Sequence, residues 1–182
     1  MADILRTDGK RIRSMSDKGR SWLVELEVGP GGLKAKHLRA YRDHIGVPTI
    51  GPGLTYLIGN GGPRRVTMAD RFESQQAAMG QFALQLKRYE AAVDAATRDD
   101  ISQEEFDALT SLCFNIGERA FAGSTLVKRF NSRAPLSVIV SELQRWNRAG
   151  GQISQGLVNR RQCEADLLQF GAYRTQGAKV AA

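Results

Sequence analysis

The sequence predicts a mostly helical α+β fold with two lobes, in which a small antiparallel sheet belongs to the N-terminal lobe and the C-terminal lobe is helical. Three observations lead to this prediction. Residues 37–67 contain short apolar runs separated by turn-forming residues, a pattern typical of strands and loops. After residue 67, apolar residues recur at the spacing of an α-helix. The helical pattern in residues 68–96 is long for a globular protein, as expected of a helix that connects two lobes.

Length and composition are those of one folded domain. The chain has 182 residues, of which 42% are hydrophobic and 25% are charged, and this balance excludes wholesale disorder. We expect one domain over residues 15–172, divided into an N-lobe at 15–67, the connecting helix at 68–96 and a C-lobe at 97–172. A basic arm at residues 1–14, expected to be flexible, and a small polar tail at 173–182 lie outside this domain.

The first helix is expected between Ser16 and Glu27. Ser16 is a suitable N-cap residue, and Trp22, Leu23 and Leu26 share one helical face. The run Val-Gly-Pro-Gly-Gly at residues 28–32 ends this helix. Glu27 therefore lies in the last turn or just past it.

The next region is expected to form two or three antiparallel strands with long loops. Ile45, Val47 and Ile50 lie in short extended runs, and turn sequences occur at residues 43–46, 51–53 and 60–63. Pro48 cannot donate a ladder hydrogen bond, so its strand is expected at an edge of the sheet.

The remaining helices are predicted from capping signals and breakers. Thr67-x-x-Asp70 resembles the start of the long helix, and Ser102-x-x-Glu105 opens the next one. Shorter helices are expected around residues 124–130, 136–146 and 157–170, because Gly117, Pro135 and Gly150-Gly151 interrupt the pattern.

The net charge of +7 favours a polyanionic partner, which could be nucleic acid, anionic lipid or an anionic cell-wall polymer. Basic residues are scattered, and outside the N-terminal arm two adjacent arginines occur only at Arg64-Arg65 and Arg160-Arg161, which argues against a nucleic-acid binding stripe. No apolar run has the length of a signal peptide or a membrane span. We therefore expect a chain made in a cytoplasm, without membrane insertion.

Cysteine and histidine content limits metal and redox chemistry. Cys113 and Cys163 each lie in an apolar, helix-like context, which predicts core thiols rather than a disulfide or a nucleophile. The two histidines, His37 and His44, show no paired Cys/His spacing, so we expect no zinc site and no cofactor.

Two carboxylates stand out as a candidate acid/base pair. Glu27 lies at a helix C-terminus, where the negative end of the helix dipole disfavours an anion, and Asp43 lies in a turn of the sheet region. Carboxylates in different environments are what glycoside hydrolysis requires, although a solvated Glu and a turn-forming Asp would show the same pattern. Glu25 is the rival acid, but it points to a different face of the helix from Glu27.

Several motifs extend this reading. The segment 36–53 reads KHLRAYRDHIGVPTIGPG, and it follows a Glu-bearing helix at residues 18–27. Three further motifs follow in order, at residues 106–117 (FDALTSLCFNIG), 121–126 (FAGSTL) and 145–161 (RWNRAGG, then GLVNRR). Together they resemble the phage-type lysozymes, the endolysins of glycoside hydrolase family 24, over roughly residues 18–170.

The resemblance implies a lysozyme-like fold and a peptidoglycan hydrolase that cleaves the β-1,4 bond between N-acetylmuramic acid and N-acetylglucosamine, for cell-wall degradation and host lysis. It implies Glu27 as the general acid, Asp43 as the base that positions water, and Thr49 as a second holder of that water. It also implies an inverting reaction without a metal or cofactor, and it assigns substrate binding or support to Tyr41, Asn159 and Arg160. Residue by residue, Asn115 and Asn159 are expected to be structural amides, and Trp22 and Trp146 to pack in the core or cleft wall.

The resemblance also implies partners. Peptidoglycan is the expected polymer, reached at the periplasm or wall through a holin or by carriage within a virus particle, and the protein is expected to be a monomer. The chain departs from the family pattern by an insertion at residues 28–35 and by Pro48 and Pro52 in place of aromatics. These departures motivate an alternative, a catalytically weakened wall-docking component of a phage particle. A nucleic-acid binder and a lytic transglycosylase are further alternatives, and Asp43 with Thr49 speaks against the latter.

Overall fold

The computed structural model describes residues 13–43 and 45–175. Of these, residues 21–87 form one compact unit and the other described residues form a second. Helices dominate, with small antiparallel sheets, which confirms the predicted fold class. Most of the predicted arm at residues 1–14 and of the tail at 173–182 lies outside the described residues.

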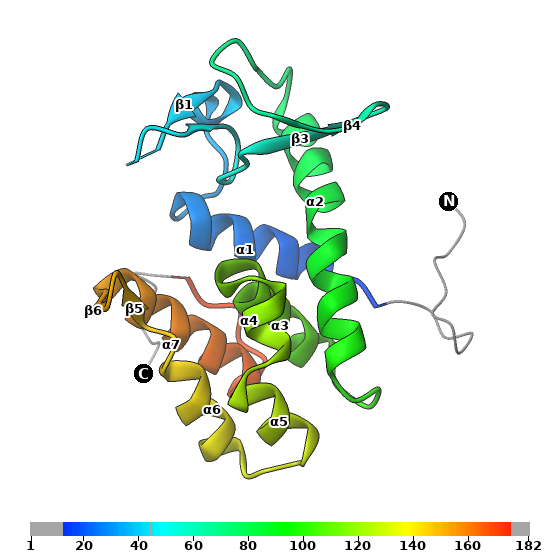
Figure 1. Ribbon diagram of the computed structural model, residues 1–182, viewed down its shortest axis with the longest axis vertical. Helices are drawn as coiled ribbons and strands as arrows, with labels where there is room; N and C mark the ends of the chain where they lie inside the picture. The colour runs from blue at the N-terminus through cyan, green and yellow to red at the C-terminus, as the bar shows by residue number, and fades with distance from the viewer. Residues whose placement is uncertain (1–12, 44, 176–182) are drawn as a thin grey trace. The chain divides into compact units, whose positions relative to one another are not determined.

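The unit of residues 21–87 holds four of the strands, which pair as two hairpins. In the first hairpin Tyr41 pairs with Thr49, and in the second Tyr56 pairs with Arg65. The turn at residues 51–53 separates the hairpins, so they form two sheets rather than the single sheet that the sequence predicts. The elements of this part of the chain are α1 (Asp17–Val28), the 3₁₀ helix η1 (Ala35–Leu38), β1 (Tyr41–Arg42), β2 (Pro48–Thr49), β3 (Tyr56–Gly59), β4 (Gly62–Arg65) and α2 (Gln75–Ala96) (Figure 1).

Side chains of α2 form hydrogen bonds with the backbone of β3 along its free edge. The Gln81 amide accepts a hydrogen bond from the Ile58 N–H at 2.9 Å and donates one to the Ile58 carbonyl at 2.9 Å. Gln85 donates to the Tyr56 carbonyl one turn further along the helix. These bonds satisfy backbone groups that an exposed strand edge would otherwise leave unpaired.

The long helix begins later than the sequence predicts. The helix expected from residue 68 begins at Gln75, where the Ser74 hydroxyl accepts from the Ala77 N–H at 3.1 Å. The predicted helix start at Thr67-x-x-Asp70 is wrong. Instead, the Asp70 carboxylate accepts from the Thr67 N–H at 2.7 Å and from the Thr67 hydroxyl at 3.0 Å. These bonds close a turn rather than cap a helix.

The second unit is helical apart from one short hairpin. Helices α3 and α6 both pack against α7, and large buried side chains such as Phe106, Phe121 and Phe130 fill its core. The hairpin β5–β6 turns at Gly150 and Gly151, which have φ of +56° and +79°. The sequence predicts only a break between two helices at these glycines, and not the hairpin. The elements are α3 (Gln103–Ile116), α4 (Glu118–Ala122), α5 (Thr125–Asn131), α6 (Leu136–Gln144), β5 (Arg148–Ala149), β6 (Gln152–Ile153) and α7 (Gln155–Phe170) (Figure 1).

The predicted core thiols are confirmed. Cys113 and Cys163 are buried and are not bonded to each other. Burial raises the pKa of Cys113 to about 12 and that of Cys163 to about 11. Both side chains are therefore neutral, unreactive thiols near pH 7.

The N-terminus of α1 is attached to α3 through Asp107, whose side chain is fully buried. The Ser16 hydroxyl accepts from the Gly19 N–H at 2.8 Å, which confirms Ser16 as the N-cap, and donates to Asp107 Oδ2 at 2.6 Å. The Tyr173 hydroxyl donates to the same Asp107 oxygen at 2.8 Å. Close approach of α1 to this carboxylate requires glycine at position 19, because a Cβ atom there would overlap Asp107.

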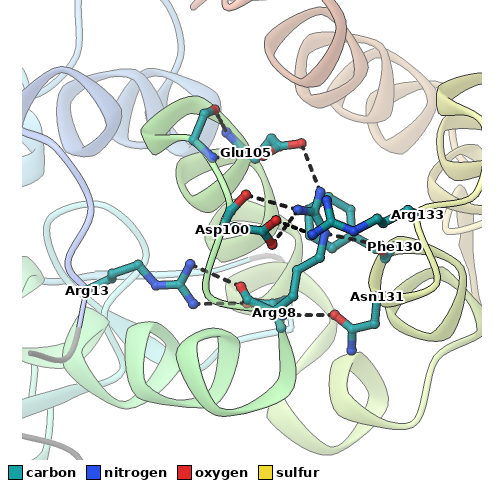
Figure 2. Close-up of polar contacts among 9 residues, drawn as sticks. Arg13, Arg98, Asp100, Glu105, Phe130, Asn131 and Arg133 are labelled. Carbon is teal, nitrogen blue, oxygen red and sulfur yellow. Dashed lines mark hydrogen bonds and ion pairs between the residues drawn. The ribbon is translucent and has the colours of Figure 1, made fainter. Parts of the chain in front are cut away.

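An ion-pair cluster joins the segment after α2 to α5 (Figure 2). Arg98 contacts Asp100 at 2.7 Å, and Arg133 pairs with the same carboxylate. The Arg98 N–H donates to the Asn131 side chain at 2.9 Å. The two arginines lower the pKa of Asp100 from its ordinary value of 3.8 to about 2, mainly through their hydrogen bonds to the carboxylate.

We expect Gly19→Ala to destabilise the protein by about 2 kcal/mol or more, because the added methyl group forces α1 away from Asp107. Gly80→Ala is the matched control, since a Cβ atom at this exposed position of α2 meets no heavy atom within 4 Å. That variant should be stabilised by about 0.5–1 kcal/mol through helix propensity. Urea unfolding measures both changes, and equal effects of the two substitutions would contradict the packing of Gly19 on Asp107.

Asp100→Asn should lower the thermal midpoint near pH 7, and this effect should disappear as the pH falls through about 2. The folded-state pKa of Asp100 is depressed, so its contribution to stability is complete above the ordinary pKa of 3.8 and is lost as the pH falls to about 2. Thermal unfolding of both proteins across this range tests the sign. Because the group is exposed, about 1 M salt should shrink the difference at neutral pH. A difference that grows on acidification would contradict the ion pairs in Figure 2.

Candidate active site

Glu27 lines a pocket within the unit of residues 21–87. It lies in the last turn of α1, as the sequence predicts, and its side chain is half-buried. The pocket has a volume of about 330 Å³ and is lined by Glu27, Val28, Lys36, His37 and Tyr41. Glu25, the rival acid, is not among the lining residues. Of the two glutamates near the end of α1, Glu27 is therefore the one whose position beside a pocket suits a candidate acid.

The chain after Glu27 turns sharply before it returns to the pocket. Gly29 and Gly32 have φ of +90° and +66°, a backbone region that glycine adopts at low cost. Leu33, at 8% exposure, is buried, and its carbonyl accepts a hydrogen bond from the Gln75 side chain at 2.8 Å. The insertion at residues 28–35 is thus anchored to the first residue of α2.

Asp43 occupies the loop between β1 and β2. Its Oδ1 accepts from the Ile45 N–H at 3.0 Å and from the Val47 N–H at 2.8 Å. The loop also closes through backbone bonds from Asp43 to Val47 and from Gly46 to Asp43, both at 3.0 Å. These bonds fix the orientation of the carboxylate, and Oδ2 has no hydrogen-bond partner among the described residues.

Thr49 is held by the same residue that holds Asp43. It lies in β2, is 3% exposed, and donates its hydroxyl proton to the Val47 carbonyl at 3.0 Å. Because that proton is committed, the Thr49 hydroxyl oxygen can only accept a further hydrogen bond. Val47 thus positions both candidate water-holding groups through its backbone.

Tyr41 connects the pocket to this loop. It lies in β1, lines the Glu27 pocket and pairs with Thr49 across the hairpin. Burial raises the pKa of Tyr41, and the negative charges of Glu27 and Asp43 raise it further. The tyrosine hydroxyl is therefore within electrostatic reach of both candidate carboxylates.

Arg160 and Asn159 lie in α7, which belongs to the other unit. Arg160 is 5% exposed, its Nε contacts Glu164 Oε1 at 3.2 Å, and its Nη2 contacts the Ser111 hydroxyl at 3.3 Å. Asn159 is exposed on the helix and accepts from the Gln155 side chain at 2.8 Å. Within their own unit, Arg160 belongs to the core and Asn159 to the surface.

Glu164 is the centre of the cluster that holds Arg160. It is fully buried, accepts from the Ser111 hydroxyl at 2.7 Å and pairs with Arg161 Nε at 2.8 Å. The Arg161 guanidinium also donates to Asn115 Oδ1 at 3.1 Å, so Asn115 has the structural role that the sequence predicts. Buried carboxylates are stable only when paired in this way.

Sequence reasoning did not identify His37 and Lys36 as pocket residues. Both follow the insertion at residues 28–35, and that departure from the family pattern was the one signal that marked the region. Within the described ranges no group of three or more His, Cys, Asp or Glu side chains could hold a metal ion. None of the described helices is both long and apolar enough to cross a bilayer.

Comparison with known proteins identifies relatives. The family model for phage lysozyme matches residues 32–164. An endolysin of Bacillus phage PZA is 33% identical over 140 residues, which cover 74% of this chain and 49% of that protein. An endolysin of Salmonella phage P22 is 36% identical over 99 residues, which cover 54% of this chain and 64% of that protein. The matches thus span less than two thirds of these two curated relatives.

The fold is also similar to that of a solved structure. The endolysin from Escherichia coli O157:H7 phage FAHEc1 superposes with a TM-score of 0.76 at 33% identity. The superposition covers 90% of this chain and 98% of that one. The similarity therefore includes nearly all the described elements.

Glu164→Gln should destabilise the protein by about 3–5 kcal/mol, because it leaves the buried guanidinium of Arg161 without its anionic partner. Glu142→Gln is the matched control, since its partner Arg145 is 72% exposed and the pair is 3.3 Å long. That change should cost less than about 1 kcal/mol. Urea unfolding of both variants gives the comparison, and a cost for Glu164 no larger than for Glu142 would contradict the role of the buried pair.

Proposed function

This chain belongs to the phage lysozyme family, and on that basis we propose that it is a peptidoglycan hydrolase. The proposed reaction is cleavage of the β-1,4 bond between N-acetylmuramic acid and N-acetylglucosamine. The observation that carries the proposal is the convergence of Glu27, Tyr41 and Asp43 around one pocket and its adjoining loop. Two carboxylates and no required metal are the minimum that glycoside hydrolysis needs.

Glu27 is the proposed general acid. Its carboxyl group would donate a proton to the glycosidic oxygen as the bond to the anomeric carbon breaks. Its place on the pocket wall, beside Tyr41, allows a sugar ring to reach it. Glu25, on the same helix but outside the pocket lining, has no such access.

Asp43 and Thr49 are the proposed holders of the attacking water. Asp43 Oδ2 and the Thr49 hydroxyl oxygen both act as acceptors, so one water molecule could donate one proton to each. A water bound in this way directs a lone pair toward the anomeric carbon, and Asp43 takes up the proton that the water loses. Because water itself displaces the leaving sugar in one step, we propose inversion at the anomeric carbon.

The other expected site residues have supporting roles in this proposal. Tyr41 would contact the sugar bound against Glu27. Arg160 and Asn159 keep the role in substrate binding or support that the family resemblance assigns to them, and residues 15–172 are proposed as one catalytic domain. The relatives named endolysin favour a role in degrading the bacterial wall for host lysis. Access to the wall through a holin or within a virus particle, and action as a monomer, complete the proposal.

We expect Glu27→Gln to abolish digestion of purified peptidoglycan, with a loss of about 10³-fold or more, because glutamine cannot donate the proton. Glu25→Gln is the matched control, on the same helix and of the same size, and should retain activity within about threefold. Mass spectrometry of the products should show reducing ends without anhydro sugars.

Three outcomes would contradict parts of this proposal. Loss of activity in Glu25→Gln alone would move the acid to Glu25. Anhydro products would identify a lytic transglycosylase instead. A folded wild-type protein that binds the wall but releases no products would be a wall-docking component, and the hydrolase proposal would then be wrong.

A further inference from the structure

His37 is held rigidly at the wall of the Glu27 pocket. Its backbone N–H donates to the Lys34 carbonyl at 2.8 Å, and its carbonyl accepts from the Gly51 N–H at 2.9 Å. Its ring Nδ1 accepts a hydrogen bond from the Lys34 N–H at 2.9 Å. Backbone and ring are therefore both fixed, and the side chain is only 7% exposed.

These bonds determine which ring nitrogen carries the proton. A nitrogen that accepts from a backbone N–H cannot itself be protonated, so Nδ1 is bare and Nε2 carries the hydrogen. Burial, and then the charges of Lys36 and Lys34, lower the pKa of His37 below its ordinary value of 6.5. The ring is thus neutral near pH 7, with Nε2–H as its one donor.

That donor is available. Nε2 has no hydrogen-bond partner among the residues that the structure describes, and it is not one of the side-chain atoms sealed from solvent without a partner. His37 lines the same pocket as Glu27. A rigid, uncommitted donor in a small pocket is a preorganised contact for a ligand oxygen.

The other walls of the pocket indicate the kind of group that this donor meets. Val28 offers an apolar surface, and Tyr41 offers an aromatic ring. An acetamido group combines a methyl, which suits an apolar wall, with a carbonyl oxygen, which accepts from a neutral N–H. Both sugars of the proposed substrate carry this group.

We propose that His37 is a substrate-binding and specificity-determining residue, whose Nε2–H donates to the acetamido carbonyl of a sugar bound in the Glu27 pocket. The inference rests on the proposed function for the identity of the substrate. His37, which follows the insertion at residues 28–35, would thus be added to the proposed substrate-binding residues. Its contact with the acetamido group would make the site prefer N-acetylated sugars.

Two substitutions separate this role from a structural one. His37→Asn keeps an acceptor near the position of Nδ1 for the Lys34 N–H but removes the donor at Nε2. His37→Gln places an amide N–H near the position of Nε2 but loses the local acceptor. The structural role therefore predicts that Gln is the more harmful change, and the binding role predicts that Asn is.

The test uses chitotetraose, a soluble β-1,4 tetramer of N-acetylglucosamine, as the probe. Calorimetry on the full chain should show affinity about fivefold weaker for His37→Asn and within about twofold of wild type for His37→Gln. Thermal unfolding of each variant accompanies the titrations. Equal affinity of wild type and His37→Asn, or a larger loss in His37→Gln, would overturn the proposal.

Nitrogen-15 NMR supplies a readout that stability does not move. The chain has only two histidines, so the His37 ring signals can be assigned by their loss in His37→Asn. The Nε2 signal should be that of a protonated nitrogen and should shift with chitotetraose. It should not shift with cellotetraose, the glucose tetramer that lacks acetamido groups, and an equal shift with both sugars would contradict the assigned contact.

The outcome for His37 is distinct from the outcome for the enzyme. If wild type digests peptidoglycan while His37→Asn binds chitotetraose normally, the hydrolase proposal stands and the His37 proposal is wrong. If wild type releases no products, the hydrolase proposal fails, and the chitotetraose titration still decides whether His37 binds an N-acetylated sugar.

Discussion

The packing of the helical unit depends on one fully buried carboxylate. Glu164 cannot stay ionised in the core without partners, and α7 supplies two of them, Arg160 and Arg161, while Ser111 on α3 supplies a third contact. The two arginines lie on the same helix as Glu164, so the contacts that join α7 to α3 are those to Ser111 and Asn115, and a shift of either helix would break them. They also fix the Arg160 side chain within the helical unit.

In the unit of residues 21–87, hydrogen bonds to the backbone fix the candidate site residues. This unit is rich in loops, and its candidate site groups are held by backbone amides and carbonyls rather than by buried charge. Val47 holds Asp43 and Thr49, and Lys34 holds His37. Side chains fixed by such bonds need little reorganisation when substrate binds, which is the property that an active site requires.

Local signals in the sequence were accurate where the interacting residues lie within one turn of chain. Ser16 caps α1, and Ser102 with Glu105 forms the capping box of α3, as their spacing indicates. The same type of signal was wrong at Thr67, where Asp70 turns back onto residue 67. The hairpin at Gly150-Gly151 was also missed, because its strands are too short to show a period.

By itself the sequence determined the fold class, the helical end at which Glu27 lies and the turn that holds Asp43, because periodicity, caps and glycine-rich breaks act over a few residues. Tertiary structure alone decided which side chains share a pocket. His37 reaches the Glu27 pocket because Gly51 fixes its carbonyl and Gln75 anchors the preceding insertion at Leu33. These bonds join residues distant in the chain, and no local pattern encodes them.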